Sequence, residues 1–144
     1  MIAVATNILV YAHREDSHFH AEATRVLSGL AAGTRRWAVP WPCAHEFIAI
    51  VTHPRIYKDP TPLPLALQAL RKLEALSNLE LIGEDDGYLA VLERTAIPAH
   101  VEGGAIHDAR IAALCLHHGV EELWSADRDF SRFVQLKVRN PLLR

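Results

Sequence analysis

The 144-residue sequence has few cysteines, no long apolar run and no excess of basic charge. Its two cysteines, Cys43 and Cys115, lack the spacing of a metal-binding pair, which favours a reduced, cytoplasmic protein. No stretch approaches the roughly 20 apolar residues that a membrane-spanning helix needs, so no membrane association is expected. Residues 1–4 enter an apolar run without a basic leader, which argues against a secretory signal.

Internal repeats, low-complexity tracts and interdomain linkers are also missing from the sequence. A chain of this length is near the usual size of one domain, and we therefore predict a single domain over residues 1–144. The longest break lies at 58–64, where three alternating prolines predict an extended loop that leads into a helix.

The net charge of −2 contrasts with the basic surface that supplies most non-specific affinity for nucleic acid. A few acidic residues concentrated in one metal site would still leave the remaining surface locally basic. Basic pairs are available for this at 35–36, 55 and 58, 71–72, 128 and 132, and 137 and 139. Each pair taken alone is better explained as solvated surface, so the net charge excludes no nucleic-acid function.

Hydrophobic spacing predicts strands that alternate with helices along the chain. Strands are expected at 2–4, 37–39, 79–82 and 122–125, with an edge strand at 137–139. Helices are expected at 7–14, 19–30, 43–52, 65–76, 88–95 and 106–118, with a short turn or helix at 130–133. This alternation predicts an α/β fold with a parallel central sheet flanked by helices. In such sheets, functional residues gather at the carboxyl ends of the strands.

Acidic and polar residues follow the predicted strands at that edge. Carboxylates that converge in one cleft raise one another's pKa unless a divalent cation neutralises them. Mg²⁺ and Mn²⁺ prefer oxygen ligands, polarise phosphates and activate water, as phosphodiester hydrolysis requires. The residues concerned are Ala5, Thr6 and Asn7 after the first strand, Glu46 after the second, Asp108 in a later helix, and Ser125, Asp127 and Asp129 after the last central strand.

Each of these acidic residues also has a simpler explanation. Glu46 could be an exposed position on an amphipathic helix. Asp108 could stabilise the start of its helix through the helix dipole and have no other role. Asp127 and Asp129 could form turns through local hydrogen bonds. The joint placement after successive strands is what favours a shared site.

Other residues give weaker indications. The nine histidines include the group at 13, 18 and 20 and the adjacent pair at 117–118, but neither has zinc-protease spacing or a cysteine partner. Surface histidines, or histidines with satisfied hydrogen bonds, are the better explanation for both groups. Leucines at 67, 70, 73 and 76 form either a core stripe or a contact surface for a partner. A receiver-like phosphoacceptor domain would need paired acids after the first strand and a later lysine, and both are missing.

Three segments together with Glu46 resemble the PIN domain, and more narrowly the VapC toxins of bacterial toxin–antitoxin pairs. They are IAVATNILVY at 2–11, IHDARIAA at 106–113 and SADRDF at 125–130. The resemblance spans essentially the whole chain and implies a three-layer sandwich. It implies a Mg²⁺- or Mn²⁺-dependent endoribonuclease toxin that cuts structured RNA, either tRNA or rRNA. It further implies a homodimer and a cognate VapB-like antitoxin that lays a C-terminal segment across the site.

By position, the resemblance makes Glu46, Asp108 and Asp127 metal-site carboxylates and Asp129 an accessory one. Ser125 stands where the family often has a hydroxyl near the site. Thr6 and Asn7 would support the first corner, with one of them near the cap of the first helix.

The chain departs from the family pattern at residue 5, where the family has an aspartate that binds metal and this sequence has Ala5. A methyl group cannot bind a hard cation, so we expect impaired metal binding and cleavage. Ala5 is either a natural loss or a deliberate change that allows a toxic nuclease to be produced, and the intact neighbours favour the second. The alternative function is a non-catalytic module that engages an antitoxin-like peptide through its acidic cleft.

Overall fold

Five short strands form one parallel sheet in the computed structural model, which describes residues 1–143. Their order in the sheet is β3-β2-β1-β4-β5, and every neighbouring pair is parallel. This confirms the parallel sheet predicted from the sequence, with 137–139 as its edge strand. The strands are β1 (Ile2–Val4), β2 (Trp37–Pro40), β3 (Leu79–Ile82), β4 (Glu122–Trp124) and β5 (Lys137–Arg139).

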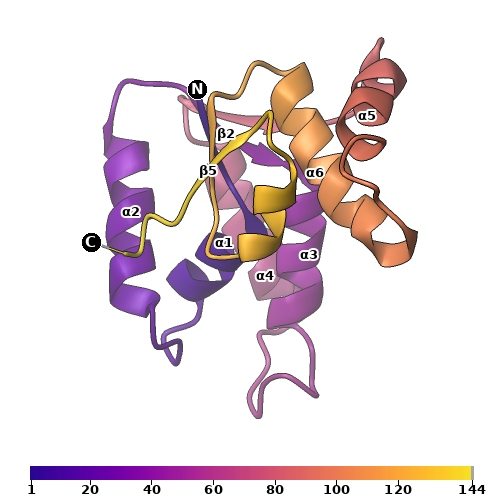
Figure 1. The fold of residues 1–144 in the computed structure, drawn as a ribbon. Helices are drawn as coiled ribbons and strands as arrows, with labels where there is room; N and C mark the ends of the chain where they lie inside the picture. Colours follow the sequence, from indigo (N-terminus) through magenta and orange to yellow (C-terminus); the bar gives the residue numbers. More distant parts are fainter. Residues whose placement is uncertain (144) are drawn as a thin grey trace.

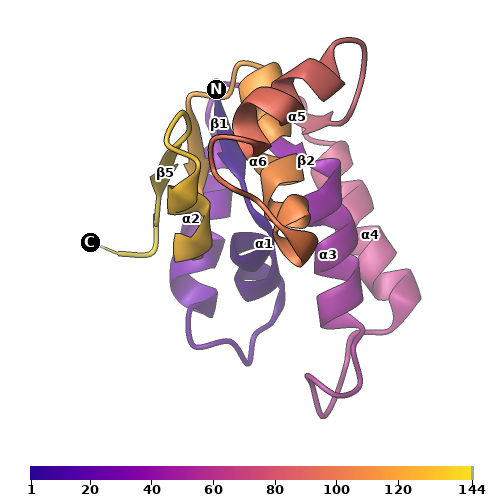
Figure 2. The same cartoon turned by 45° about the vertical axis from the view of Figure 1, so that its right-hand side comes forward.

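Helices flank this sheet on both faces and give a three-layer α/β sandwich (Figures 1 and 2). Helix α1 packs against α2 and α3, and α5 packs against α6. Within residues 1–143, no helix is long and apolar enough to cross a membrane. The helices are α1 (Thr6–His13), α2 (His20–Ala32), α3 (Trp41–Val51), α4 (Leu63–Glu74), α5 (Tyr88–Ala96) and α6 (Ile106–His117), with 3₁₀ turns η1 (Gly103–Ala105) and η2 (Arg128–Arg132).

The central strands are apolar at consecutive positions because both of their faces are covered. All four residues of β2 are buried, as are Ala3 and Val4 of β1. Strands covered on both sides have continuous apolar runs instead of the alternation of a half-exposed strand. The core therefore lies on both sides of β1 and β2, and these strands form a rigid base for the residues that follow them.

The starts of three helices differ from the sequence prediction, in the cap or by a proline in the first turn. Ala5 is the N-cap of α1, with no side-chain hydrogen bond, whereas we expected Thr6 or Asn7 near the cap. Helix α3 begins at Trp41 and includes Pro42 in its first turn, whereas we expected it to begin after this proline. Helix α4 begins at Leu63 and includes Pro64 in its first turn, whereas the sequence predicts a loop over 58–64 and a helix from 65. Proline is tolerated in the first turn because the N–H groups there have no partner within the helix.

The strand order places a topological switch point between β1 and β4. The chain runs outward from β1 to β2 and β3, and then returns to the other side of β1 as β4. In parallel sheets a crevice opens at such a point, outside the carboxyl ends of the strands. Val4 pairs with Trp124, and the Ala5 N–H donates to the Trp124 carbonyl at 3.0 Å. Residues 5–7 and 125–129 therefore meet at this crevice.

Candidate functional site

A cavity of about 220 Å³ lies at the carboxyl ends of β1 and β4. Its lining combines polar residues from α1, α3, α6 and the segment after β4 with apolar and aromatic side chains. Seven of the eight site residues predicted from the sequence line it, and Asp129 lies beside it in a cluster with two of them. The seven are Ala5, Thr6, Asn7, Glu46, Asp108, Ser125 and Asp127.

Ala5 has extended backbone dihedrals, with φ at −85° and ψ at 170°, and is 2% exposed. It is the residue at which the chain turns from β1 into α1. Helices prefer Asn, Asp, Ser or Thr at this position because such side chains accept a hydrogen bond from a free N–H of the first turn. Alanine supplies neither this cap nor a metal ligand, although its position lines the cavity.

A series of hydrogen bonds joins the start of α1 to the end of β4. The Asn7 amide donates to the Ser125 hydroxyl at 3.5 Å, and its oxygen accepts from the Ala126 N–H at 3.2 Å. The Ser125 hydroxyl accepts from the Asp127 N–H at 3.0 Å, and the Asp127 carboxylate accepts from the Asp129 N–H at 2.8 Å. These contacts hold the β4 segment against the first corner and so fix where its two aspartates lie.

Asp108, Asp127 and Asp129 each place a carboxylate oxygen within 4.8 Å of the others. Burial raises the pKa of Asp108, and the charges of the two neighbouring aspartates raise it further. Burial likewise raises the pKa of Glu46, as does the charge of Asp108, while the Thr6 side chain partly offsets the increase. The four acids therefore act on one another as one site.

None of these four carboxylates forms an ion pair within residues 1–143. The positive charges of Arg132 and His107 lower the pKa of Asp108, but they are weaker influences than burial and the other acids. Asp108 also lies in the first turn of α6, where the helix dipole favours a negative charge. Converging, uncompensated carboxylate oxygens are the ligands that Mg²⁺ and Mn²⁺ prefer, so the residues present fit a divalent cation.

The structure adds aromatic residues that the sequence did not single out. Tyr57, in the loop at 52–62 between α3 and α4, lines the cavity together with Tyr11. The Arg14 guanidinium lies 3.9 Å from the centre of the Tyr57 ring and donates to the Asp59 carbonyl at 2.9 Å. No local pattern marks Tyr57, because its place depends on how a long loop folds back on α1.

Comparison with known proteins assigns this architecture to a family. The PIN domain model matches residues 2–136. Ribonuclease VapC43 of Mycobacterium tuberculosis is 34% identical over 142 residues, covering 99% of this chain and 96% of its own length.

Solved structures share the fold at lower sequence identity. VapBC2 from Rickettsia felis, bound to a DNA fragment from the promoter, has a TM-score of 0.70 at 21% identity and covers 97% of this chain and 98% of its own. The sarcin-ricin-loop-cleaving toxin VapC20 of M. tuberculosis has a TM-score of 0.64 at 17% identity and covers 91% and 93%. The chain therefore belongs to the PIN-domain family, and VapC ribonucleases are among its relatives.

Proposed function

We propose that this protein is a VapC-type endoribonuclease toxin whose cleavage activity depends on Mg²⁺ or Mn²⁺ and is suppressed by Ala5. The observation that carries the proposal is the convergence of Glu46, Asp108, Asp127 and Asp129, without ion pairs in residues 1–143, at the switch point of a PIN-domain sheet. The names of its relatives support a ribonuclease.

In this proposal Glu46, Asp108 and Asp127 hold the metal, and Asp129 supports the cluster. A bound divalent cation would polarise the scissile phosphate and lower the pKa of a water molecule. Asn7 and Ser125 position Asp127 through the hydrogen bonds described above.

Structured RNA is the proposed substrate class. One structural relative is described as cleaving the sarcin-ricin loop, a defined segment of a folded RNA. Such an RNA would bring its phosphates to the acidic cleft with the cation, while basic residues away from the cleft would bind the surrounding backbone. Arg128 and Arg132 on η2 lie next to the acidic cluster and are exposed.

An antitoxin partner is proposed from the structural relatives, which include the VapBC2 and FitAB toxin–antitoxin assemblies. An arginine of a partner segment could pair with the cleft carboxylates in place of a cation. Helix α4 offers a second contact area, since Leu63, Leu65 and Leu67 are each about half exposed. The leucines at 70, 73 and 76 instead pack against the core. A homodimer is proposed from the family resemblance.

A non-catalytic binding module is the second candidate function, and Ala5 is the observation that favours it. Both candidates use the same cleft, so the substitution Ala5→Asp separates them. After brief expression of Ala5→Asp in cells, the 5′ ends of total RNA are mapped. The nuclease proposal predicts one or a few discrete new ends in a structured RNA, which disappear when Asp108→Asn is added. An unchanged pattern with a co-purifying partner would favour the binding module.

A further inference from the structure

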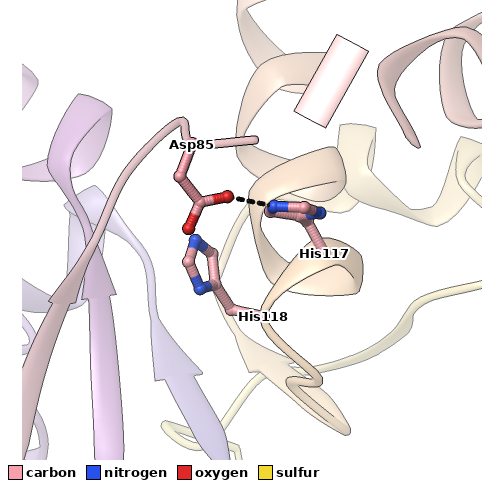
Figure 3. A group of neighbouring side chains, drawn as sticks. All are labelled: Asp85, His117 and His118. Atoms are coloured by element: carbon pink, nitrogen blue, oxygen red, sulfur yellow. Dashed lines mark hydrogen bonds and ion pairs between the residues drawn. The ribbon is translucent and has the colours of Figure 1, made fainter. Parts of the chain in front are cut away.

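We propose that Asp85, His117 and His118 form a binding site for a transition-metal ion such as Zn²⁺, separate from the acidic cleft. Each of the three residues offers a ligand atom, and these atoms lie within 4.8 Å of one another. Figure 3 shows the Asp85 carboxylate between the two imidazole rings, with one oxygen directed at each ring. The site therefore joins the loop after β3 to the carboxyl-terminal end of α6.

The chemical types of these ligand atoms indicate which metal ion the site would prefer. Imidazole nitrogen suits Zn²⁺, Ni²⁺ and Co²⁺, whereas Mg²⁺ prefers an all-oxygen set. Two histidines and one carboxylate make a frequent three-ligand zinc set, in which water takes the fourth position. With bonds of about 2.0 Å, ligand atoms around a tetrahedral ion lie about 3.3 Å apart. The three ligand atoms, each within 4.8 Å of the others, lie close to this spacing.

Two contacts already hold the ligands in place. His117 Nε2 contacts an oxygen of Asp85, and His118 Nε2 donates to the Gly83 carbonyl at 2.7 Å. The two imidazole rings are 5.1 Å apart and nearly perpendicular. While Nε2 of His118 donates to Gly83 it carries a proton, so binding an ion through this nitrogen would replace that proton and the contact with the carbonyl. Because the rings are oriented by folding, little side-chain freedom would be lost when an ion binds.

The position at the end of α6 also favours a cation. His117 is the last residue of α6 and His118 is its C-cap, where unpaired carbonyls carry partial negative charge. On the other side of the contact, Arg110 of α6 pairs with Glu84 in the same loop as Asp85. A bound ion would add a second connection between this loop and α6, and we infer a structural role for it.

The acidic cleft lies at the opposite end of the same helix. Asp108 is in the first turn of α6 and His117 is in the last, nine residues later. At a rise of 1.5 Å per residue the two positions are about 14 Å apart along the axis. One ion cannot occupy both, so substitutions can distinguish the two sites.

The sequence favours surface or hydrogen-bonded positions for the adjacent histidines, because they lack zinc-protease spacing and a cysteine partner. The third ligand is Asp85, 32 positions earlier in the chain. Only the packing of α6 beside the end of β3 brings the residues together. A simple His–Asp ion pair is the competing explanation, and it would involve His117 without requiring His118.

The test is calorimetric titration of the metal-free protein with Zn²⁺, carried out in excess Mg²⁺, which competes with Zn²⁺ for the acidic cleft. We expect one Zn²⁺ per chain. Asp85→Asn, His117→Gln and His118→Gln should each weaken binding at least about tenfold, because every one removes a ligand. His18→Gln, which changes an exposed histidine elsewhere, is the matched control and should leave binding unchanged.

Two further measurements make the result decisive. Zn²⁺ in about 100-fold excess over its Kd should raise the Tm by about 5–10 °C. Co²⁺ in place of Zn²⁺ should give the visible absorption of a four-coordinate site, and this should disappear in His118→Gln. The proposal is overturned if Zn²⁺ does not bind saturably, if His118→Gln binds like the unsubstituted protein, or if only Asp108→Asn abolishes binding.

Discussion

Ala5 lies where β1 passes into α1, and it lines the same cavity as Glu46, Asp108 and Asp127. An aspartate at this position would serve two physical purposes, since it caps a helix and adds an oxygen ligand for a cation. It would also add a fifth negative charge to a site in which the existing acids already raise the pKa of Asp108 and Glu46. Without a cation, repulsion between this fifth charge and the other carboxylates opposes the stabilisation that the helix cap provides.

Comparing Ala5→Asp with Ala5→Asn separates these effects. Both side chains can cap α1, so Ala5→Asn should raise the free energy of unfolding by about 1 kcal/mol. In the presence of a chelator, Ala5→Asp should be less stable than Ala5→Asn because the other carboxylates repel the negative charge of the new aspartate. Mg²⁺ should stabilise Ala5→Asp more than Ala5→Asn, as measured by urea unfolding. Equal effects of Mg²⁺ on both variants would count against residue 5 as a ligand position.

The raised pKa of Asp108 predicts a pH dependence of stability. A carboxyl whose pKa is higher in the folded state keeps its proton when the unfolded chain has lost it. Stability in metal-free buffer should therefore fall as the pH rises from about 4 through the raised folded-state value. Asp108→Asn should remove part of this fall and be the more stable form at pH 7, by less than about 1 kcal/mol because solvent screens the site.

Thermal unfolding between pH 4 and pH 7 measures this effect. Asp86→Asn, at an exposed acid outside the cleft, is the matched control and should follow the unsubstituted protein. If Asp108→Asn is less stable than the unsubstituted protein at pH 7 without metal, the inferred repulsion in the cleft is wrong.

The two cysteines are both fully buried, and burial raises the pKa of both thiols, that of Cys43 to about 12. Because the thiolate is the reactive form, neither should react with a thiol reagent in the folded protein at neutral pH. Titration with a chromogenic disulfide reagent should detect no thiol in the native state and two after unfolding. Rapid reaction of one native thiol would show that α3 or α6 opens locally.

At the scale of elements, Arg14 makes several contacts that hold the loop at 52–62 beside the cleft, and His13 adds one to the Thr61 hydroxyl at 3.1 Å. Arg14 stacks on Tyr57, donates to the Asp59 carbonyl at 2.9 Å and to the Thr61 hydroxyl at 3.3 Å, and pairs with Asp16 at 2.7 Å. Its planar guanidinium makes these contacts at the same time, which a lysine cannot reproduce. The loop carries Tyr57 into the cavity, so its order affects the shape of the site.

Arg14→Ala should release this loop and destabilise the fold by about 1–2 kcal/mol, through lost hydrogen bonds and packing. Hydrogen exchange should accelerate at 53–61 and stay unchanged in β1 and β2. Arg25→Ala, on the exposed face of α2, is the control and should alter neither region. Unchanged exchange at 53–61 would mean that other contacts order the loop.

Element identity was predictable because each element has a strong local pattern. The apolar runs of β1 and β2 and the spacing of α4 and α6 do not depend on distant contacts. The start of α3 was harder to place, because a proline is equally compatible with the end of a loop and the first turn of a helix. The cap of α1 was misplaced because Ala5 carries no capping side chain.

The candidate site was predictable to the extent that its residues directly follow strands. Asn7, Asp127 and their neighbours are fixed by the ends of β1 and β4, and the rule for parallel sheets brings those ends together. Tyr57 and the cluster around Asp85 depend on loop folding and on the packing of α6. The spacing of residues within one segment does not predict such contacts between distant segments.

At the scale of the whole molecule, the strand order determines where chemistry can occur. At the junction of β1 and β4 the segments that follow the two strands diverge at the carboxyl ends of the sheet, and the acids of α3, α6 and η2 converge there. The proposed zinc site lies at the other end of α6, so the helix would connect a catalytic cation to a structural one. The acidic cleft is the region in which the proposed function can be tested directly.

The most direct test is RNA cleavage by purified Ala5→Asp in Mn²⁺ or Mg²⁺, compared with the unsubstituted protein and Ala5→Asn. The account predicts metal-dependent cleavage by Ala5→Asp at least about 100-fold faster than by either comparison protein, because only this variant gains the missing ligand. Chelator and Asp108→Asn should each abolish it. A folded, Mg²⁺-binding Ala5→Asp protein that cuts no structured RNA would contradict the account.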